Sequence, residues 1–349
     1  MVKRMLSGRK TPTIQDVARE AGVSTATVSR ALSSPERVSR STRDRIDQAV
    51  RMTGYTINQA ARSLRKRASN TILVALPDIG NPFFSRILEA VEREAAARQF
   101  NVLVANRRPE TDQATRLLDY MQSNSADGIL LFDGSLDLER FRGLARDSAH
   151  MPLVVACEDI PGSGLATVKT DNVCAGRRAT EHLLSLGHRR IAHLLGPSGN
   201  VLTTERLQGY SEALSAAGLP IEREWIIPGD FHMENGAEAA QRFRESESPP
   251  TAIFCANDEM AIGFISEMQR HGYLCPRDVS VVGFDDITLA ARYHPPLTTM
   301  RQPTEELGHI SAMTLLDILE GKRAANAPRE IILESQLVVR ESTAPPSHG

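Results

Sequence analysis

The sequence has few of the features that mark secreted and membrane proteins. It holds only four cysteines among 349 residues, with no C-x-x-C pair and no histidine at zinc-ligand spacing, so neither a disulfide framework nor a zinc site is predicted. No run of about eighteen apolar residues occurs, and no apolar stretch follows the basic first ten residues. We therefore expect a cytoplasmic protein with no membrane segment and with reduced, mostly buried thiols at Cys157, Cys174, Cys255 and Cys275.

Net charge is also small, but it is unevenly divided along the chain. The whole sequence carries 41 Lys and Arg against 43 Asp and Glu, a formal charge of −2. The first 68 residues hold 15 of the basic and 5 of the acidic residues, which is +10 and leaves −12 for the remainder. A basic head in front of an acidic body predicts a polyanionic partner at one end, and the length predicts two or three domains.

The first fifth of the chain predicts two short helices packed crosswise. In TIQDVAREAGVSTATVSRAL, Thr13 and Asp16 form a capping-box pattern at the start of the first helix. Gly22 ends that helix, since glycine adopts the left-handed conformation without a side-chain clash, and Ser24 is expected to cap the next one.

The second helix is expected to turn small side chains outward. Val28 and Leu32 would face the first helix, which leaves a face that is small apart from one arginine: Thr25, Ala26, Ser29 and Arg30. Such a face suits a DNA major groove, because bulky side chains would hold the helix away from the base edges. A plain helical hairpin is the alternative, but the caps, the turn glycine and the local charge together favour DNA binding.

A third helix should follow, with Ser41 as its cap, Ile46, Ala49 and Val50 on its inner face, and Gly54 at its end.

The segment YTINQAARSLRKRASN that comes next differs in composition from both a core and a linker. Asn58 would cap a short helix whose alanines let two copies pack closely, and Leu64 would act as an apolar wedge in a minor-groove step. A basic, partly ordered linker is the alternative.

After Asn70 short apolar runs alternate with helical stretches. This alternation predicts doubly wound parallel sheets, because parallel strands need crossover helices, and its fresh start near residue 190 predicts two similar lobes. The predicted strands are 71–77, 100–106, 127–132, 152–156, 190–196, 251–257 and 279–285.

Several polar and aromatic residues lie where such strands end, which is where ligands bind in these folds. Asp285 and Asp286, with no glycine-rich phosphate loop nearby, suit hydroxyl or amine donors rather than an anion. Asp258 fits either a helix cap or a ligand contact. Arg206 lies in the first turn of a helix, where it opposes the dipole, and Phe231 is a candidate platform for a ring.

These motifs make the chain similar to the LacI (lactose repressor) family of bacterial regulators. In the head the resemblance rests on TIQDVAREAGVSTATVSRAL, VSRSTRDRI and YTINQAARSL, and it continues to about Arg340. In detail ILVALPDIGNPFFS, RLQGY, PTAIFCAND and VSVVGFDD resemble the cytidine and purine repressors. Ile57 departs from the family, where a proline is common.

The resemblance implies roles for residues in both parts. It implies base contacts from the start of the second helix and a wedge at Leu64. The implied DNA contacts are Thr13, Ser24, Thr25, Ala26, Thr27, Ser29, Arg30, Asn58, Ala61, Leu64 and Arg65. It also implies a small-molecule effector between the lobes, bracketed by Arg206 and Asp285 and stacked on Phe231. The implied effector contacts are Asp78, Asn81, Phe83, Asn200, Leu202, Arg206, Phe231, Asn257, Asp258 and Asp285.

The expected fold is an N-terminal all-α helix-turn-helix domain joined to an α/β body of two doubly wound parallel-sheet lobes, of the periplasmic-binding-protein type I. We expect the head in residues 1–57, a hinge helix and linker in 58–69, and an effector-binding and dimerisation body in 70–345. Lobe 1 would span about 70–169 and 303–328, and lobe 2 about 170–302 and 329–345.

The expected function is sequence-specific repression of transcription by a homodimer on a pseudo-palindromic double-stranded DNA operator, without cofactor, metal or catalysis. Leu202 stands where the purine repressor is polar, so a sugar or nucleoside effector is favoured, acting as inducer or co-repressor. A periplasmic-type solute-binding protein, an enzyme and an effector-independent architectural DNA-binding protein are the alternatives. The first lacks a secretion signal, and the second lacks the common catalytic motifs.

Two smaller features complete the expectations. His182, His188 and His193 are expected to be surface or core histidines, because their spacing suits no metal site on one helix face. The last residues, ESTAPPSHG, are expected to form a disordered tail.

Overall fold

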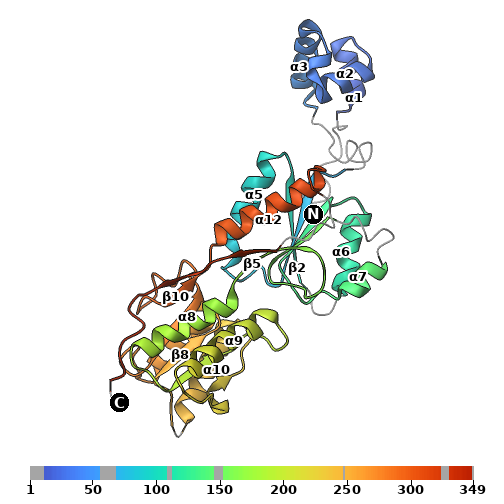
Figure 1. The fold of residues 1–349 in the computed structure, drawn as a ribbon. Helices are drawn as coiled ribbons and strands as arrows, with labels where there is room; N and C mark the ends of the chain where they lie inside the picture. Colours follow the sequence, from blue (N-terminus) through green and yellow to red (C-terminus); the bar gives the residue numbers. More distant parts are fainter. Residues whose placement is uncertain are drawn as a thin grey trace, which may run out of the picture. The chain divides into compact units, whose positions relative to one another are not determined.

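The computed structural model describes residues 12–55, 68–107, 112–144, 152–246, 248–323 and 330–347. The chain divides into two compact units, Met1–Ser69 and Asn70–Gly349 (Figure 1).

The described residues of the first unit, 12–55 and 68–69, form a bundle of three helices. They are α1 (Ile14–Ala21), α2 (Thr25–Ser33) and α3 (Arg40–Thr53), with a 3-10 turn, η1 (Pro35–Arg37), between the last two. Their apolar faces meet in one small core, in which Val17, Val28 and Ile46 are fully buried. Burial of this kind stabilises helices that are too short to be stable alone.

The expected helix ends of the first unit are confirmed with one correction. The backbone N–H of Thr13 donates to the Asp16 carboxylate at 2.9 Å, and Gly22 ends α1 in the left-handed conformation with φ 63°. The Ser24 hydroxyl accepts from the backbone N–H of Thr27 at 3.1 Å. Ser39, not Ser41, caps α3, because its hydroxyl lies one residue before the helix and accepts from the backbone N–H of Thr42.

The second unit consists of two lobes, each built on a six-stranded sheet. The sheet of lobe 1 has the order β11-β5-β4-β3-β1-β2, and all neighbouring strands are parallel. Its strands are β1 (Thr71–Leu76), β2 (Asn101–Asn106), β3 (Gly128–Leu131), β4 (Leu153–Cys157), β5 (Ala166–Thr170) and β11 (Glu330–Leu333). Its helices are α5 (Phe84–Ala97), α6 (Gln113–Gln122), α7 (Leu138–Leu144) and α12 (Thr304–Leu319).

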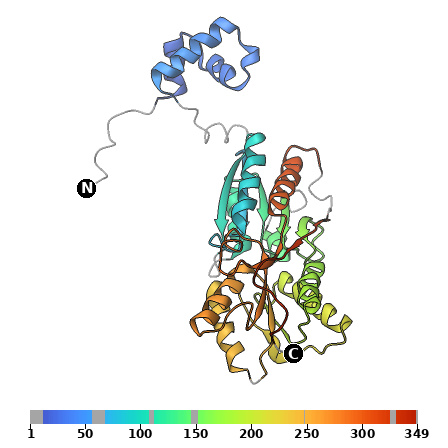
Figure 2. The same cartoon turned by 90° about the vertical axis from the view of Figure 1, so that its left-hand side faces the viewer.

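The sheet of lobe 2 has the order β12-β10-β9-β8-β6-β7, and β12 is antiparallel to β10. Its strands are β6 (Ile191–Leu194), β7 (Ile226–Ile227), β8 (Ala252–Cys255), β9 (Ser280–Asp285), β10 (Thr298–Arg301) and β12 (Gln336–Val338). Its helices are α8 (Asn172–Ser185), α9 (Val201–Ala216), α10 (Met233–Glu245) and α11 (Asp258–Arg270), with a 3-10 turn, η3 (Arg223–Trp225). Figure 2 shows the two lobes one above the other within this unit.

All seven predicted strands are present, and the two sheets share one strand order, as the repeated pattern indicated. The chain passes between the lobes three times, from β5 to α8, from β10 to α12 and from β11 to β12. Residues 330–333 were expected in lobe 2, but as β11 they pair with β5 of lobe 1. The short strand β11 completes the edge of that sheet before the chain crosses back.

The expectation of a disordered tail is wrong for residues 341–347, which lie against lobe 2. The Ser342 hydroxyl donates to the Val281 carbonyl at 2.6 Å, and Ser342 is fully buried. The Ala344 carbonyl lies 2.9 Å from Nε2 of His188, a buried histidine. Ser342 and Thr343 bond to residues at the starts of β9 and β10, a role that composition alone does not reveal.

Three further expectations concern buried groups and the membrane. Cys157, Cys255 and Cys275 are free and buried, whereas Cys174 is partly exposed. His193 belongs to the core of lobe 2, stacked on Phe254. Among the described residues, no helix has the length and apolarity that a bilayer-spanning segment requires.

Candidate functional site

The exposed face of α2 carries the residues that sequence reasoning assigned to DNA. Thr25, Ala26 and Arg30 are exposed, while Val28 on the opposite face is fully buried. Small exposed side chains at the start of a helix allow close approach to base edges. Of the other expected contacts, Thr13 and Ser24 are exposed and Thr27 and Ser29 are partly exposed, whereas Asn58, Ala61, Leu64 and Arg65 lie outside the described residues.

The turn between α1 and α2 is held by an arginine that sequence reasoning missed. Nη2 of Arg45, on α3, donates to the carbonyls of Ala21 at 2.5 Å and Gly22 at 3.2 Å. These are carbonyls that the end of α1 leaves without helical partners. Arg45 therefore fixes the angle at which α2 leaves the turn.

A cavity of about 700 Å³ lies between the two lobes, at the carboxyl ends of their strands. This is where ligands bind in doubly wound folds. Nine of the ten residues expected to contact an effector line it: Asp78, Asn81, Phe83, Asn200, Leu202, Arg206, Phe231, Asn257 and Asp285.

Arg206 forms part of the floor of this cavity and is only 2% exposed. Its Nε donates to Oδ1 of Asn172 at 3.0 Å, and its Nη1 donates to the Ala256 carbonyl. The guanidinium lies over the Phe284 ring, 3.6 Å from its centroid. Burial lowers the pKa of Arg206, and the charge of Asp285 opposes this effect. An arginine side chain remains a cation in proteins, and the hydrogen bonds and the ring contact hold this one in a single orientation.

Asp285 faces the same space from the end of β9. Its Oδ1 accepts from Nε2 of Gln302 at 2.7 Å. Burial raises the pKa of Asp285 to about 7, in spite of the opposing charge of Arg206. A buried carboxyl with its pKa near neutrality can accept hydrogen bonds when ionised and donate one when protonated, and it is a candidate functional group.

Phe231 supplies an apolar wall and occupies a constrained position. Its backbone has φ 73°, and its carbonyl accepts from Nδ2 of Asn257 at 2.8 Å. A Cβ placed on Gly196 would lie 2.3 Å from Cζ of Phe231, so the glycine leaves the room that the ring needs. Phe83, from lobe 1, lines the cavity as well.

Asp258 is the one expected effector contact that does not line the cavity. It is fully buried, and its carboxylate accepts from the Thr299 hydroxyl at 2.6 Å and from the backbone N–H of Ile287 at 2.9 Å. Asn257 caps α11, because its Oδ1 accepts from the backbone N–H of Met260. Asp258 is therefore neither a helix cap nor a residue that lines the cavity. Its carboxylate instead joins α11 to β10 and to the segment after β9.

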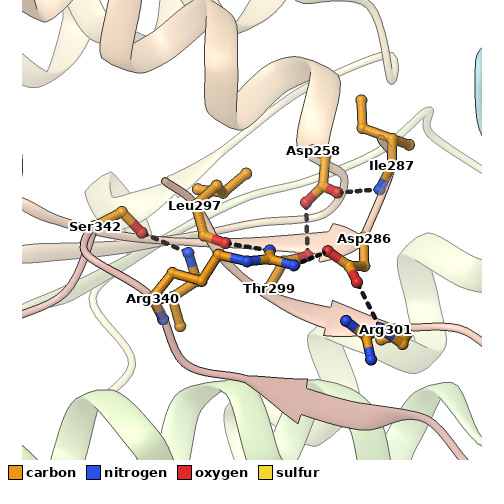
Figure 3. A network of polar contacts seen from close by, with 9 residues as sticks. Asp258, Asp286, Ile287, Leu297, Thr299, Arg301, Arg340 and Ser342 are labelled. Carbon is orange, nitrogen blue, oxygen red and sulfur yellow. Dashed lines mark hydrogen bonds and ion pairs between the residues drawn. The ribbon is translucent and has the colours of Figure 1, made fainter. Parts of the chain in front are cut away.

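Figure 3 shows these contacts of Asp258 together with those of Asp286, which lies nearby in lobe 2. Asp286 is turned away from the cavity, and its carboxylate accepts from Nε of Arg301 at 2.5 Å and from Nη2 of Arg340 at 2.6 Å. Arg340 also donates to the Leu297 carbonyl at 2.7 Å. This network fixes the ends of β9 and β10, which present Asp285 to the cavity.

Glu158, which sequence reasoning missed, links the lobes across the cavity. It follows β4 of lobe 1, and its carboxylate accepts from the backbone N–H of Gly134 at 2.6 Å. It also accepts from Nδ2 of Asn200, the cap of α9 in lobe 2, at 2.9 Å. Burial raises the pKa of Glu158. Its position at the end of a predicted strand was the only available signal.

A second link joins the same helix to lobe 1. Nζ of Lys169, on β5, lies 2.8 Å from Asp159 and 2.9 Å from Glu330, and it lies 3.7 Å from Glu205 on α9. Lys169 is only 12% exposed, so these pairs are partly shielded from water. The start of α9 is therefore tied to lobe 1 on two sides of the cavity.

A small helical unit with an exposed face on α2, joined to a two-lobed body whose cavity is lined by charged, amide and aromatic side chains, is typical of a DNA-binding regulator with a ligand-binding body. Comparison with known proteins gives the family. A model for "Bacterial regulatory proteins, lacI family" matches residues 13–58, and one for "Periplasmic binding protein-like domain" matches residues 180–343. The repressor CytR of Escherichia coli (strain K12) is 38% identical over 331 residues, 95% of this chain and 96% of CytR.

Solved structures agree with this assignment. A CelR–cellobiose complex is 33% identical with a TM-score of 0.72, covering 95% of this chain and 99% of its own. The Lac repressor dimer bound to operator and the anti-inducer ONPF is 27% identical with a TM-score of 0.84, covering 96% and 100%. The chain belongs to the LacI family and is a DNA-binding transcription regulator with the fold expected from its sequence.

Proposed function

We propose that this regulator is a cytoplasmic repressor that binds a pseudo-palindromic operator as a homodimer and responds to a sugar or a nucleoside. The observation that carries the proposal is the composition of the inter-lobe cavity. Carboxylates, amides and one oriented guanidinium surround it together with the rings of Phe83 and Phe231. Such a mixture binds hydroxyl groups at its polar wall and the face of a sugar or base at its aromatic wall.

The relatives support each part of the proposal. CytR is named a transcriptional repressor, the CelR structure is described as a cellobiose complex, and the Lac repressor structure is described as a dimer on its operator. Arg206 and Asp285 would bracket the effector hydroxyl groups, and Leu202 removes one polar position that a purine base would need. Two half-sites of an operator need two reading heads, which a homodimer supplies.

Fluorescence anisotropy with the full-length chain tests the effector. A palindromic operator is first selected from random DNA, and its affinity is then measured with pentoses, hexoses, disaccharides and nucleosides. We expect one compound to shift the affinity, and the direction of the shift identifies an inducer or a co-repressor. Specific DNA binding that none of these compounds changes would instead favour an effector-independent architectural protein.

Variants of the head test the reading helix. Arg30→Ala should weaken operator binding by about 1–3 kcal/mol and relax the sequence specificity at one base pair, as expected for an arginine that contacts a guanine edge. Arg51→Ala, which removes an exposed charge from α3, is the matched control and should leave sequence preference unchanged. An equal loss on every operator variant with Arg30→Ala would show a backbone contact instead.

A further inference from the structure

The charges that line the inter-lobe cavity are mostly negative. Asp133 is 2% exposed, Glu158 6% and Asp285 7%, so all three carboxyl groups are withdrawn from solvent. Other carboxylates line the same cavity less deeply: Asp78, Asp159 and Asp230. Among the described lining residues, the arginines are Arg107 and Arg206.

Both arginines already have partners. Arg206 donates to Asn172 and to the Ala256 carbonyl, and one face of its guanidinium covers the Phe284 ring. Arg107 pairs with Asp133, with 3.5 Å between Nε and Oδ2. Each guanidinium is therefore partly engaged before a ligand binds, which reduces its capacity to bind a phosphate group.

Helix ends are the usual alternative for binding phosphate, but here they are occupied by their own side chains. Oδ1 of Asn200 accepts from the backbone N–H groups of Leu202 and Thr203 at the start of α9. Oδ1 of Asn257 does the same for Met260 on α11, and Oδ1 of Asn81 accepts from the backbone N–H of Phe83 just before α5. Three asparagines thus occupy some of the donors that an anionic group would use.

We propose that this cavity selects an uncharged or cationic effector and rejects the phosphate ester of the same compound. The inference rests on the proposed function and narrows its effector class. A phosphate group would bring about two negative charges close to three buried carboxyl groups, and each of the two lining arginines already has a partner. The regulator then responds to a compound before phosphoryl transfer, and a kinase-type reaction removes the signal.

Matched pairs test the inference on the full-length protein and its selected operator. The pairs are ribose and ribose 5-phosphate, glucose and glucose 6-phosphate, and each ribonucleoside with its 5′-monophosphate. In the pair that binds, we expect the uncharged member to bind at least about tenfold more tightly than its ester. Equal or tighter binding of an ester would overturn the inference and leave the proposed function intact. If no member of any pair binds, the proposed effector class is wrong and the inference falls with it.

A charge-removal variant locates the cause of the discrimination. Glu158→Gln keeps the shape of the side chain and an oxygen for Asn200 but removes one negative charge. It should therefore lower the ratio of the affinity for the uncharged compound to the affinity for its ester by about threefold or more. Asp133→Asn is the second variant, in case the first fails to fold, and should act in the same direction. Glu334→Gln, an exposed carboxylate outside the cavity, is the control and should leave the ratio unchanged. An unchanged ratio in both cavity variants would contradict the electrostatic explanation.

Discussion

The two lobes share one strand order, yet they hold their carboxylates in different ways. In lobe 1, Asp133 and Glu158 accept from the backbone N–H groups of Ser135 and Gly134 in a nearby loop. They also have side-chain partners outside the strands, which are Gln113 and Arg107 for Asp133 and Asn200 for Glu158. In lobe 2 the carboxylates accept mainly from side chains of β10 and of the segments beside it and after β12: Thr299, Arg301, Gln302 and Arg340.

The same fold therefore holds its carboxylates by a different set of contacts in each lobe. The carboxylates of lobe 1 bond to a loop and to side chains that lie outside the strands, so substitution of either one should disturb the sheet less. Those of lobe 2 are part of the packing between α11, β9, β10 and the chain after β12, so the cavity and the stability of this lobe are coupled. The following predictions test that contrast, and the single tryptophan, Trp225, reports on lobe 2 because it packs against its core.

The largest effect is expected where helices of lobe 2 touch through backbone. A Cβ on Gly263 of α11 would lie 2.0 Å from the carbonyl oxygen of Met233, at the start of α10. Gly263→Ala should therefore force the helices apart and lower the free energy of unfolding of lobe 2 by about 3 kcal/mol. Urea unfolding followed by Trp225 fluorescence measures this. Gly143→Ala in α7 of lobe 1 is the control and should leave the transition in place, because a Cβ there meets no described residue beyond its own helix backbone and chain neighbours within 4 Å.

The next effect concerns the buried carboxyl group of Asp258. Asp258→Ala leaves the Thr299 hydroxyl and the Ile287 N–H without their acceptor, so it should lower the free energy of unfolding by about 2–3 kcal/mol. Asp258→Asn should cost much less, because the threonine hydroxyl can turn and accept from the new amide. Equal losses in the two variants, measured by the same urea transition, would show that shape and not hydrogen bonding makes Asp258 necessary.

The third effect depends on pH. The folded-state pKa of Asp285 is raised to about 7, above the ordinary value of about 3.9 that holds in the unfolded chain. The folded state therefore binds the proton more strongly, and the resulting stabilisation is full below pH 3.9 and is lost as the pH rises through 7. Asp285→Asn removes this dependence.

Relative to Asp285→Asn, the natural protein should thus be more stable at pH 5 than at pH 8, by about 2 kcal/mol. Urea midpoints at the two pH values give this difference, and changes at other titrating groups cancel in the comparison. The same difference at both pH values would mean that Asp285 is ionised throughout this range.

The smallest effect is expected at the hydrogen bond between the lobes. Asn200→Ser keeps an oxygen to cap α9 but is too short to reach Glu158, so stability should change by less than about 1 kcal/mol. Hydrogen exchange at Gly134 should nevertheless become faster, because Glu158 loses the contact that orders it. Asn200→Ala, which also removes the cap, should add faster exchange at the start of α9. Unchanged exchange at Gly134 in both variants would show that Glu158 is ordered by lobe 1 alone.

Much of the fold was predictable because buried parallel strands are continuous apolar runs. The seven predicted strands are of this kind. The strands that were missed are short or partly polar: β5, β7, β10, β11 and β12. In β10, Thr298 and Thr299 are fully buried because their polar groups bond to Ser342, Asp258 and the segment around Arg340. No local pattern identifies a polar strand whose partners lie forty residues away.

The candidate site was predictable to a similar degree. Residues that follow an apolar run and begin a helix, such as Asn200 and Asn257, could be placed near the cleft from sequence alone. The roles of Glu158 and Gln302 could not be predicted in this way. Glu158 bonds to Asn200, and Gln302 bonds to Asp285, and both partners are distant in the sequence or lie on another strand. The role of Asp258 was also predicted wrongly. Asn257, the residue before it, caps α11, and the partners of Asp258 are Thr299 and Ile287.

The sequence by itself determined the caps of α1 and α2, the buried apolar strands and the division of charge between head and body, because each depends on neighbours within one or two helical turns or on composition. Only the tertiary structure decided which carboxylates face the cavity. Asp285 and Asp286 are adjacent, with φ 114° and 56°, but the first turns to Gln302 and the cavity and the second to Arg301 and Arg340. The direction of a buried charged side chain is set by its partners, and those partners are brought to it by the fold.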